Sequence, residues 1–220
     1  MLDAARIKEL LEPFLGDTAV PADLGVQLHT YLEMLLRWNA RTNLTAVREP
    51  EQIVTRHFGE SLFAAQLLRD AGALASTGAE PLTLADIGSG AGFPGLPIKL
   101  LAPRVRLTLI ESQNKKATFL REVVRALDLK DVGVYCGRAE TWKRTANVVT
   151  LRAVEKFNAV LPIVASLVVS KGMLCLLVGA SQVESASQLL GTSWSFNAPV
   201  PIPLSEGRVV LMGVKKHGMP

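Results

Sequence analysis

Four glycines fall within residues 82–97, which read LTLADIGSGAGFPGLP and constrain the fold more than any other part of the chain. A short apolar run, residues 82–85, is followed by Asp86 and then by the glycines. Glycine adopts the positive φ angles of a tight turn, and its lack of a Cβ lets a ligand approach the backbone N–H groups. Strand, glycine turn and helix in this order predict the nucleotide pocket of an open α/β sheet, with Pro94 suited to the first turn of the helix.

The length and composition of the chain are those of a globular protein. With 220 residues, 49% of them hydrophobic and 20% charged, we expect one α/β domain with a modest extension. No apolar run approaches the roughly 20 residues that cross a bilayer, and the N-terminus lacks the apolar core of a signal peptide. We therefore expect a cytoplasmic protein without a membrane partner. Cys136 and Cys175 lie in apolar runs, so both are predicted to be buried free thiols and no metal site is expected.

Positive charge is concentrated in the middle of the chain. Residues 81–160 contain 13 Lys and Arg against 7 Asp and Glu, whereas residues 1–80 contain 7 against 11. A basic face around a nucleotide pocket favours an anionic partner, with nucleic acid the leading candidate. A solvated surface without a partner is the alternative.

Helices are predicted before any strand. Apolar residues recur at helical spacing over residues 7–14 and 24–36, residues 39–45 indicate a polar turn, and residues 50–68 indicate a helix with a break near Gly59. A linker rich in Ala, Gly, Ser and Thr follows at residues 72–81. We expect an N-terminal helical extension over residues 1–75 and a second domain over residues 76–220.

Strands and helices then alternate. After the first strand, further strands are predicted at residues 106–111, 132–136, 147–151 and 173–178, and helices at residues 114–127, 158–169 and 183–190. Two last β segments, residues 194–200 and 208–214, are predicted to form an antiparallel hairpin at the sheet edge. The predicted fold is α/β, with a mostly parallel seven-stranded sheet that has helices on both faces and binds ligands at the carboxyl ends of its strands.

The glycine stretch is compatible with more than one cofactor. Residues 90–95 match the GxGxxG pattern of dinucleotide-binding proteins, with Glu111 following 21 residues after Gly90, so an NAD-binding oxidoreductase is one interpretation. Asp86 and the spacing Gly88, Gly90, Gly92 favour another, because a carboxylate there would repel a pyrophosphate and attract the ammonium of S-adenosylmethionine. A P-loop is excluded because no Gly-Lys-Ser/Thr follows.

Two further strand ends provide candidate cofactor contacts. Glu111 closes the second strand, where a carboxylate can accept hydrogen bonds from both hydroxyls of a ribose; a helix-capping acid is the alternative. Residues 137–140, Gly-Arg-Ala-Glu, follow the third strand at the place of an adenine ring, although alone they would be a surface turn.

Other short motifs accompany the glycine stretch along nearly the whole chain. They are Trp38-Asn39, Asn43-Leu44-Thr45, Arg56-His57 with Ser61-Leu62, Glu111-Ser112 with Lys115-Lys116 and Phe119-Leu120, Arg138-Ala139-Glu140, and Arg152-Ala153. With the glycine stretch, these motifs and their order resemble the bacterial small-subunit ribosomal RNA guanine-N7 methyltransferases, also called the glucose-inhibited division protein B family.

The resemblance implies a Rossmann-like class I methyltransferase fold with an N-terminal helical extension. It also implies S-adenosylmethionine as methyl donor, S-adenosylhomocysteine as product, no metal, and a guanine N7 in the 530 loop of 16S rRNA as the target, in naked rRNA or in the small ribosomal subunit. A monomer is expected. The predicted cofactor-binding residues are Asp86, Gly88, Gly90, Gly92, Phe93, Glu111, Ser112, Ala139, Glu140 and Arg152, of which Gly88, Phe93, Ala139, Glu140 and Arg152 match the family's cofactor contacts.

The implied reaction makes modest demands on side-chain chemistry. Guanine N7 has a lone pair and no proton, so proximity, alignment and desolvation suffice without a strong base. Arg152 is predicted to hold guanine O6, a phosphate or the methionine carboxylate, with a salt bridge to Glu155 as the alternative. His57 is a candidate for substrate positioning, and a packed or capping histidine is the alternative.

The predicted RNA contacts form a basic group, with a solvated helix face as the alternative interpretation. They are Arg56, Lys115, Lys116, Arg121 and Arg125.

Two positions depart from the family pattern. Val178 stands where relatives usually carry Lys, and Glu60 replaces a more usual aspartate. If that lysine guides the RNA, Lys171 or Arg152 would have to replace it here. The departures leave two alternatives open, a methyltransferase of this fold with another RNA or small-molecule substrate and an RNA-binding protein that has lost catalysis.

Overall fold

Residues 2–16, 18–75 and 81–217 are described by the computed structural model. Half of the predicted linker, including residue 76 at the expected domain boundary, lies outside the described residues. Eight strands are described: β1 (Thr83–Ile87), β2 (Arg106–Glu111), β3 (Val132–Cys136), β4 (Ala146–Arg152), β5 (Val168–Gly179), β6 (Trp194–Phe196), β7 (Val200–Pro201) and β8 (Arg208–Lys215). They form one sheet in the order β3-β2-β1-β4-β5-β8-β6, with β7 also paired to β8.

The predicted Rossmann-like sheet is confirmed. Strands β1 to β5 are parallel, and β8 runs antiparallel to β5, β6 and β7. The single strand expected at residues 194–200 is instead two short strands, because Pro199 and Pro201 lack the N–H that a continuous ladder requires. The helix expected to reach residue 169 ends at Ser166, where the β-branched Val168 and Val169 begin β5.

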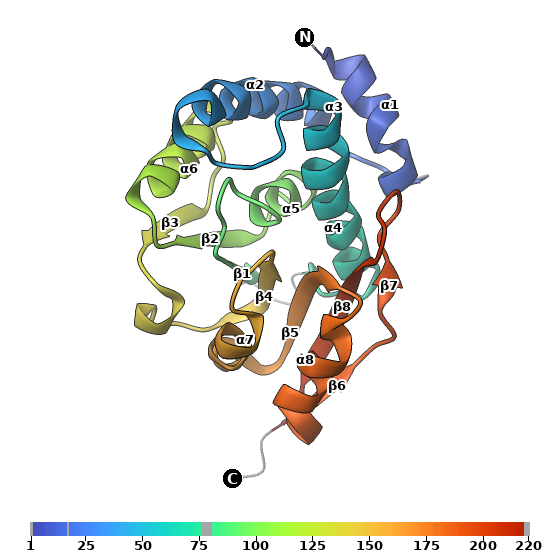
Figure 1. The fold of residues 1–220 in the computed structure, drawn as a ribbon, viewed down its shortest axis with the longest axis vertical. Helices are drawn as coiled ribbons and strands as arrows, with labels where there is room; N and C mark the ends of the chain where they lie inside the picture. Colours follow the sequence, from blue (N-terminus) through green and yellow to red (C-terminus); the bar gives the residue numbers. More distant parts are fainter. Residues whose placement is uncertain (1, 17, 76–80, 218–220) are drawn as a thin grey trace.

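Helices cover both faces of the sheet (Figure 1). Their bounds are α1 (Ala4–Leu15), α2 (Leu24–Thr42), α3 (Pro50–Ile53), α4 (Glu60–Asp70), α5 (Gly95–Leu101), α6 (Asn114–Ala126), α7 (Phe157–Ser166) and α8 (Gln182–Leu190), and a π-helical segment, Val54–Gly59, joins α3 to α4. Alternate side chains of each strand point to opposite faces, so Leu84 belongs to the core cluster that includes α1, α2 and α4–α6, whereas Ala85 and Ile87 belong to the one that includes α7 and α8.

Two N-terminal predictions change in detail. Helix α2 continues through the expected polar turn to Thr42, because buried Asn39 exchanges two hydrogen bonds with the backbone of Thr45 and so holds the loop that follows. Gly59 does not break the helix. A Cβ there would lie 2.6 Å from the ring of Phe14, so glycine is required for the close approach of α1.

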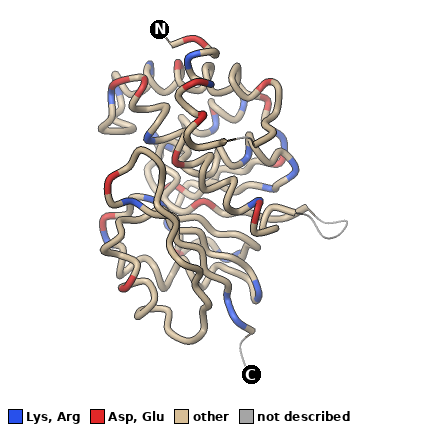
Figure 2. The backbone as a smooth tube through the Cα atoms, turned by 90° about the vertical axis from the view of Figure 1, so that its right-hand side faces the viewer, with Lys and Arg blue, Asp and Glu red and all other residues tan. Residues whose placement is uncertain are grey.

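Charged residues are unevenly distributed over the molecule. Figure 2 shows acidic and basic residues interspersed over the helical half of the molecule and long uncharged runs in the sheet. Cys175 is buried as predicted, but Cys136 is exposed, because it is the last residue of the edge strand β3. No helix in the described part of the chain is both long and apolar enough to span a bilayer.

Candidate active site

A cavity of about 430 Å³ opens at the carboxyl ends of the parallel strands. Its walls come from the glycine turn after β1, the ends of β2, β4 and β5, the π-helical segment before α4, and β8. This is the edge at which open α/β sheets bind ligands. The fold therefore brings the glycine stretch and several predicted site residues to one hollow.

The glycine turn has the backbone geometry that only glycine adopts easily. Gly88, Gly90 and Gly92 have φ angles of +65°, +57° and +97°. A Cβ on Gly88 would meet only a methyl carbon of Val154, at 3.9 Å, so that face of the turn is open. A Cβ on Gly92 would instead collide with the hydroxyl of Tyr31 and the side chain of Leu96. One side of the turn is thus free for a ligand and the other is packed against protein.

Asp86 lies beneath this turn and not among the residues that line the cavity. It is completely buried, because its side chain points to the face of the sheet on which α5 packs. Its Oδ1 accepts a hydrogen bond from Thr150 Oγ1 at 2.7 Å, and its Oδ2 accepts one from the backbone N–H of Gly95 at 3.2 Å. Burial raises the pKa of this carboxyl to about 6. Asp86 thus joins β1 to β4 and to the start of α5.

Glu111 lines the cavity at the end of β2 and holds the glycine turn. Its Oε2 accepts a hydrogen bond from the backbone N–H of Gly90 at 2.9 Å, and its Oε1 accepts one from that of Gln113 at 2.7 Å. Each carboxylate oxygen has a second lone pair, so both oxygens can still accept a hydrogen bond from a ligand. This residue and the open turn therefore form one continuous binding edge.

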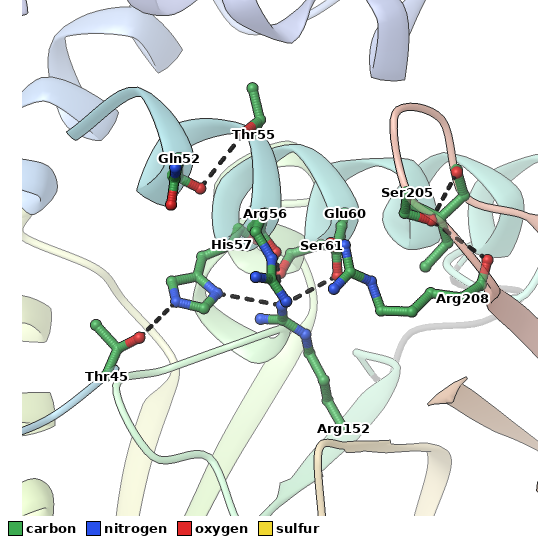
Figure 3. Close-up of polar contacts among 11 residues, drawn as sticks. Thr45, Gln52, Thr55, Arg56, His57, Glu60, Ser61, Arg152, Ser205 and Arg208 are labelled. Atoms are coloured by element: carbon green, nitrogen blue, oxygen red, sulfur yellow. Dashed lines mark hydrogen bonds and ion pairs between the residues drawn. The ribbon is translucent and has the colours of Figure 1, made fainter. Parts of the chain in front are cut away.

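A buried charge cluster forms the opposite wall. Arg152, at the end of β4, donates from Nη2 to Glu60 Oε2 at 3.0 Å and to Nδ1 of His57 at 3.1 Å, as Figure 3 shows. Arg208 of β8 pairs with the other oxygen of Glu60 at 2.6 Å. Glu60 is 2% exposed and bridges Arg152, which is 12% exposed, and Arg208, which is 28% exposed. The partner of Arg152 is Glu60, and not Glu155 as the alternative prediction had it.

His57 is held as a neutral ring. Its Nδ1 accepts from Arg152, so its Nε2–H donates to Oγ1 of Thr45 at 2.7 Å. Burial, followed by the charge of Arg152, lowers the pKa of His57 to about 3. The imidazole stacks on Phe93 with ring centroids 4.9 Å apart. A histidine in this state fixes Phe93 and Arg152 and carries no proton to or from a substrate near neutral pH.

The chain matches known proteins over most of its length. Residues 25–198 match the family model of rRNA small subunit methyltransferase G. The chain belongs to this family. A protein named ribosomal RNA small subunit methyltransferase G from Xylella fastidiosa (strain 9a5c) is 39% identical over 196 residues, which are 87% of each chain. One of the same name from Dichelobacter nodosus (strain VCS1703A) is 37% identical over 219 residues, 97% of this chain and 98% of the relative.

A likeness to solved structures supports the fold. The ribosomal protein L11 methylase from Lactobacillus delbrueckii subsp. bulgaricus superposes with a TM-score of 0.56 at 16% identity, covering 72% of this chain and 80% of that one. The methyltransferase G family and the Rossmann-like fold, both predicted from the motifs, are therefore confirmed.

The structure gathers some of the predicted site residues and leaves others outside. Those that line the cavity are Gly88, Gly90, Phe93, Glu111, Arg152, Arg56, His57 and Lys116. Those that lie outside its lining are Asp86, Gly92, Ser112, Ala139, Glu140, Lys115, Arg121 and Arg125. The short turn that carries Ala139 and Glu140 borders a separate shallow hollow next to α7.

Sequence reasoning did not assign Glu60, Arg208 or Tyr31 to the site. Arg208 comes from the last strand, and only the antiparallel register that sets it opposite Gly179 places its charge beside Val178. Lys171, a suggested substitute for the missing lysine, lies toward the amino end of β5 and outside the cavity lining. No local pattern in the sequence reveals the register of two distant strands.

Tyr31 of α2 holds the packed side of the glycine turn. Its hydroxyl donates a hydrogen bond to the carbonyl oxygen of Ala91, and its ring stacks on that of Phe93 with the ring centroids 5.5 Å apart. The side chain is fully buried, and burial raises its pKa well above the ordinary value for tyrosine. Helix α2 thus contributes directly to the shape of the pocket.

Removing this hydroxyl is expected to weaken the fold. Tyr31→Phe leaves the buried carbonyl of Ala91 without its donor, which we expect to lower the free energy of unfolding by about 1–2 kcal/mol in urea denaturation. Tyr135→Phe, which removes an exposed hydroxyl bonded to Thr141, is the matched control and should change little. Equal effects of the two substitutions would contradict the role given to Tyr31.

Proposed function

We propose that this protein transfers a methyl group from S-adenosylmethionine to N7 of a guanine in the 530 loop of 16S rRNA. Its membership in the methyltransferase G family supports the reaction and the RNA substrate. The observation that carries the proposal is the pairing of an open glycine turn with a carboxylate, Glu111, across one cavity from two arginines.

The residues along one wall fit S-adenosylmethionine. The open face of Gly88 and Gly90 would accept the amino-acid end without steric hindrance, and Glu111 would accept hydrogen bonds from the ribose hydroxyls. When bound, the cofactor supplies a methyl group on a positively charged sulfur. S-adenosylhomocysteine is the product. Within the described residues, no group of three or more His, Cys, Asp and Glu could hold a metal ion.

The other wall fits a guanine and its phosphate. Within the described part of the chain, every hydrogen bond of the Arg152 side chain starts from Nη2, so Nη1 and Nε can donate to guanine O6 or to a phosphate. Because guanine N7 needs no deprotonation, a neutral His57 with a pKa of about 3 is no disadvantage. The chain's own contribution is to orient the base and exclude water.

Methyl transfer to rRNA tests the proposal. Purified protein is incubated with tritiated S-adenosylmethionine and 16S rRNA, either naked or in small subunits, from cells that lack this modification. We expect label at one guanine, located by N7-specific strand scission. Absence of label in guanine from both substrates would overturn the proposal. Calorimetry with S-adenosylhomocysteine and NAD tests the cofactor, and tight binding of NAD alone would favour the oxidoreductase alternative.

Glu111→Ala is expected to weaken binding of S-adenosylhomocysteine by about 1.5–3 kcal/mol, roughly 10- to 150-fold. The substitution removes the acceptor for the ribose and also releases the backbone of Gly90. Isothermal titration calorimetry measures the change. Glu140→Ala changes a predicted cofactor contact that lies outside the cavity lining, so it should weaken binding less than Glu111→Ala. A larger loss of affinity in Glu140→Ala would instead indicate that the cofactor binds near the turn after β3.

A further inference from the structure

A second hollow, of about 640 Å³, lies on the surface between the C-terminal half of α2 and α6. Its lining includes Arg37, Trp38 and Arg41 from α2 and Glu122 from α6. The two helices pack against each other and lie next to one another in Figure 1. We name this hollow the α2–α6 groove.

We propose that the α2–α6 groove binds the phosphates of the RNA strand that flanks the target guanine. This inference rests on the proposed function, because it extends the substrate contacts of the same cavity. It adds Arg37 and Arg41, from the N-terminal helical extension, to the surface that holds RNA.

The groove carries positive charge without a compensating partner. Arg37 and Arg41 are both exposed and lie one turn apart, about 6 Å along one face of the helix. Within residues 2–16, 18–75 and 81–217, neither side chain forms an ion pair or a hydrogen bond. Two free guanidinium groups on one face suit consecutive phosphates of a nucleic acid.

The one carboxylate in the lining is already engaged. Glu122 is half-buried, and its Oε2 accepts a hydrogen bond from Nε1 of Trp38 at 3.1 Å. This bond fixes the indole, which also packs on the ring of Phe119 with the ring centroids 5.6 Å apart. The groove therefore combines an aromatic ring, held by a hydrogen bond, with two exposed arginines.

Two segments of the chain lead from the groove to the cavity. Helix α2 ends at Thr42, and the chain continues directly to Leu44 and Thr45, which line the cavity. On the other wall, Lys116 in the first turn of α6 lines the cavity as well. A strand that places one base in the cavity can therefore extend along α6 into the groove. An acidic protein segment would have no comparable reason to follow this path into the site.

Charge reversal in the full-length protein tests the assignment. In Arg37→Glu/Arg41→Glu, the affinity for a 16S rRNA fragment containing the 530 loop, measured by fluorescence anisotropy, should fall at least about tenfold. Removal of one phosphate contact reduces the dependence of log affinity on log salt by about 0.7 for single-stranded RNA, so for two contacts we expect a decrease of about 1.4. In methylation assays, KM for RNA should rise while kcat and the affinity for S-adenosylhomocysteine stay unchanged.

Arg104→Glu/Arg106→Glu is the matched control. It makes the same change in net charge at exposed positions by the amino end of β2, the sheet edge opposite the cavity. Equal RNA affinity and equal salt dependence in the two double variants would overturn the inference. So would loss of methylation of assembled subunits with unchanged binding of naked RNA, which would assign the groove to a ribosomal protein. If the unaltered protein neither binds nor methylates rRNA, the proposed function itself fails.

Discussion

Replacing Glu60 with Gln is expected to lower the free energy of unfolding by about 3–5 kcal/mol. Glu60 supplies the negative charge that lies between Arg152 and Arg208, and it is 2% exposed. The glutamine keeps the shape and one oxygen acceptor but leaves the guanidinium groups of Arg152 and Arg208, whose side chains are 12% and 28% exposed, next to each other without a counter-charge. Urea or guanidinium denaturation followed by circular dichroism measures the change.

A surface ion pair provides the control for Glu60. Glu51 pairs with Arg6 at 3.0 Å, where both side chains are largely exposed, so Glu51→Gln should leave the free energy of unfolding almost unchanged. If Glu60→Gln changed the free energy of unfolding as little as Glu51→Gln, water would have to screen the charges of Arg152 and Arg208 from each other. Methyl transfer by the Glu60→Gln variant should also fall at temperatures where it stays folded, because Arg152 loses its fixed position.

Gly88→Val is expected to weaken S-adenosylhomocysteine binding by at least about 3 kcal/mol, a factor of about 150. A β-branched side chain is strained at a φ of +65°. Its carbon atoms would also project from the open face of the turn into the cavity, where only Val154 lies near. Calorimetric titration with the product measures the loss of affinity.

The control for Gly88→Val is a glycine with a similar positive φ angle that lies outside the cavity lining. Gly72 has a φ of +70°, a Cβ added to it would have nothing within 4 Å, and it lies after α4, away from the cavity lining. Gly72→Val should therefore cost stability but keep cofactor affinity. Comparable affinity losses in the two variants would mean that the strain acts through overall stability, and that the open face of the turn does not contact the cofactor.

Local periodicity predicted most of the fold. Strands β2 and β3 have the predicted bounds, and the alternation of strands and helices along the chain predicted a mostly parallel sheet with helices on both faces. The errors occur where tertiary contacts override local preference. Asn39 lies within helix α2, and its side-chain amide forms hydrogen bonds with the backbone of Thr45. Gly59 is needed because Phe14 packs closely against it, and the helix does not break there. Neither contact is visible in the sequence near those residues.

The site residues that were predictable from the sequence are those at the carboxyl end of a strand. Gly88, Glu111 and Arg152 each stand at the carboxyl end of a parallel strand, so strand order alone brings them together. Asp86 is the last residue but one of β1, and the pleat turns its side chain away from the cavity, toward the face of the sheet on which α5 packs. Glu60 and Arg208 come from elements whose placement depends on packing and antiparallel register, which spacing along the chain does not encode.

The hydrogen bond from Tyr31 to Ala91 has a consequence for how sequence variation in this chain should be interpreted. The two residues are 60 positions apart, and one belongs to α2 while the other belongs to the glycine turn. The conformation of the turn is therefore specified by two segments that must change together. A substitution in α2 that is harmless to helix formation can still act as a pocket mutation, and a transplanted glycine motif would need its own tyrosine to keep its shape.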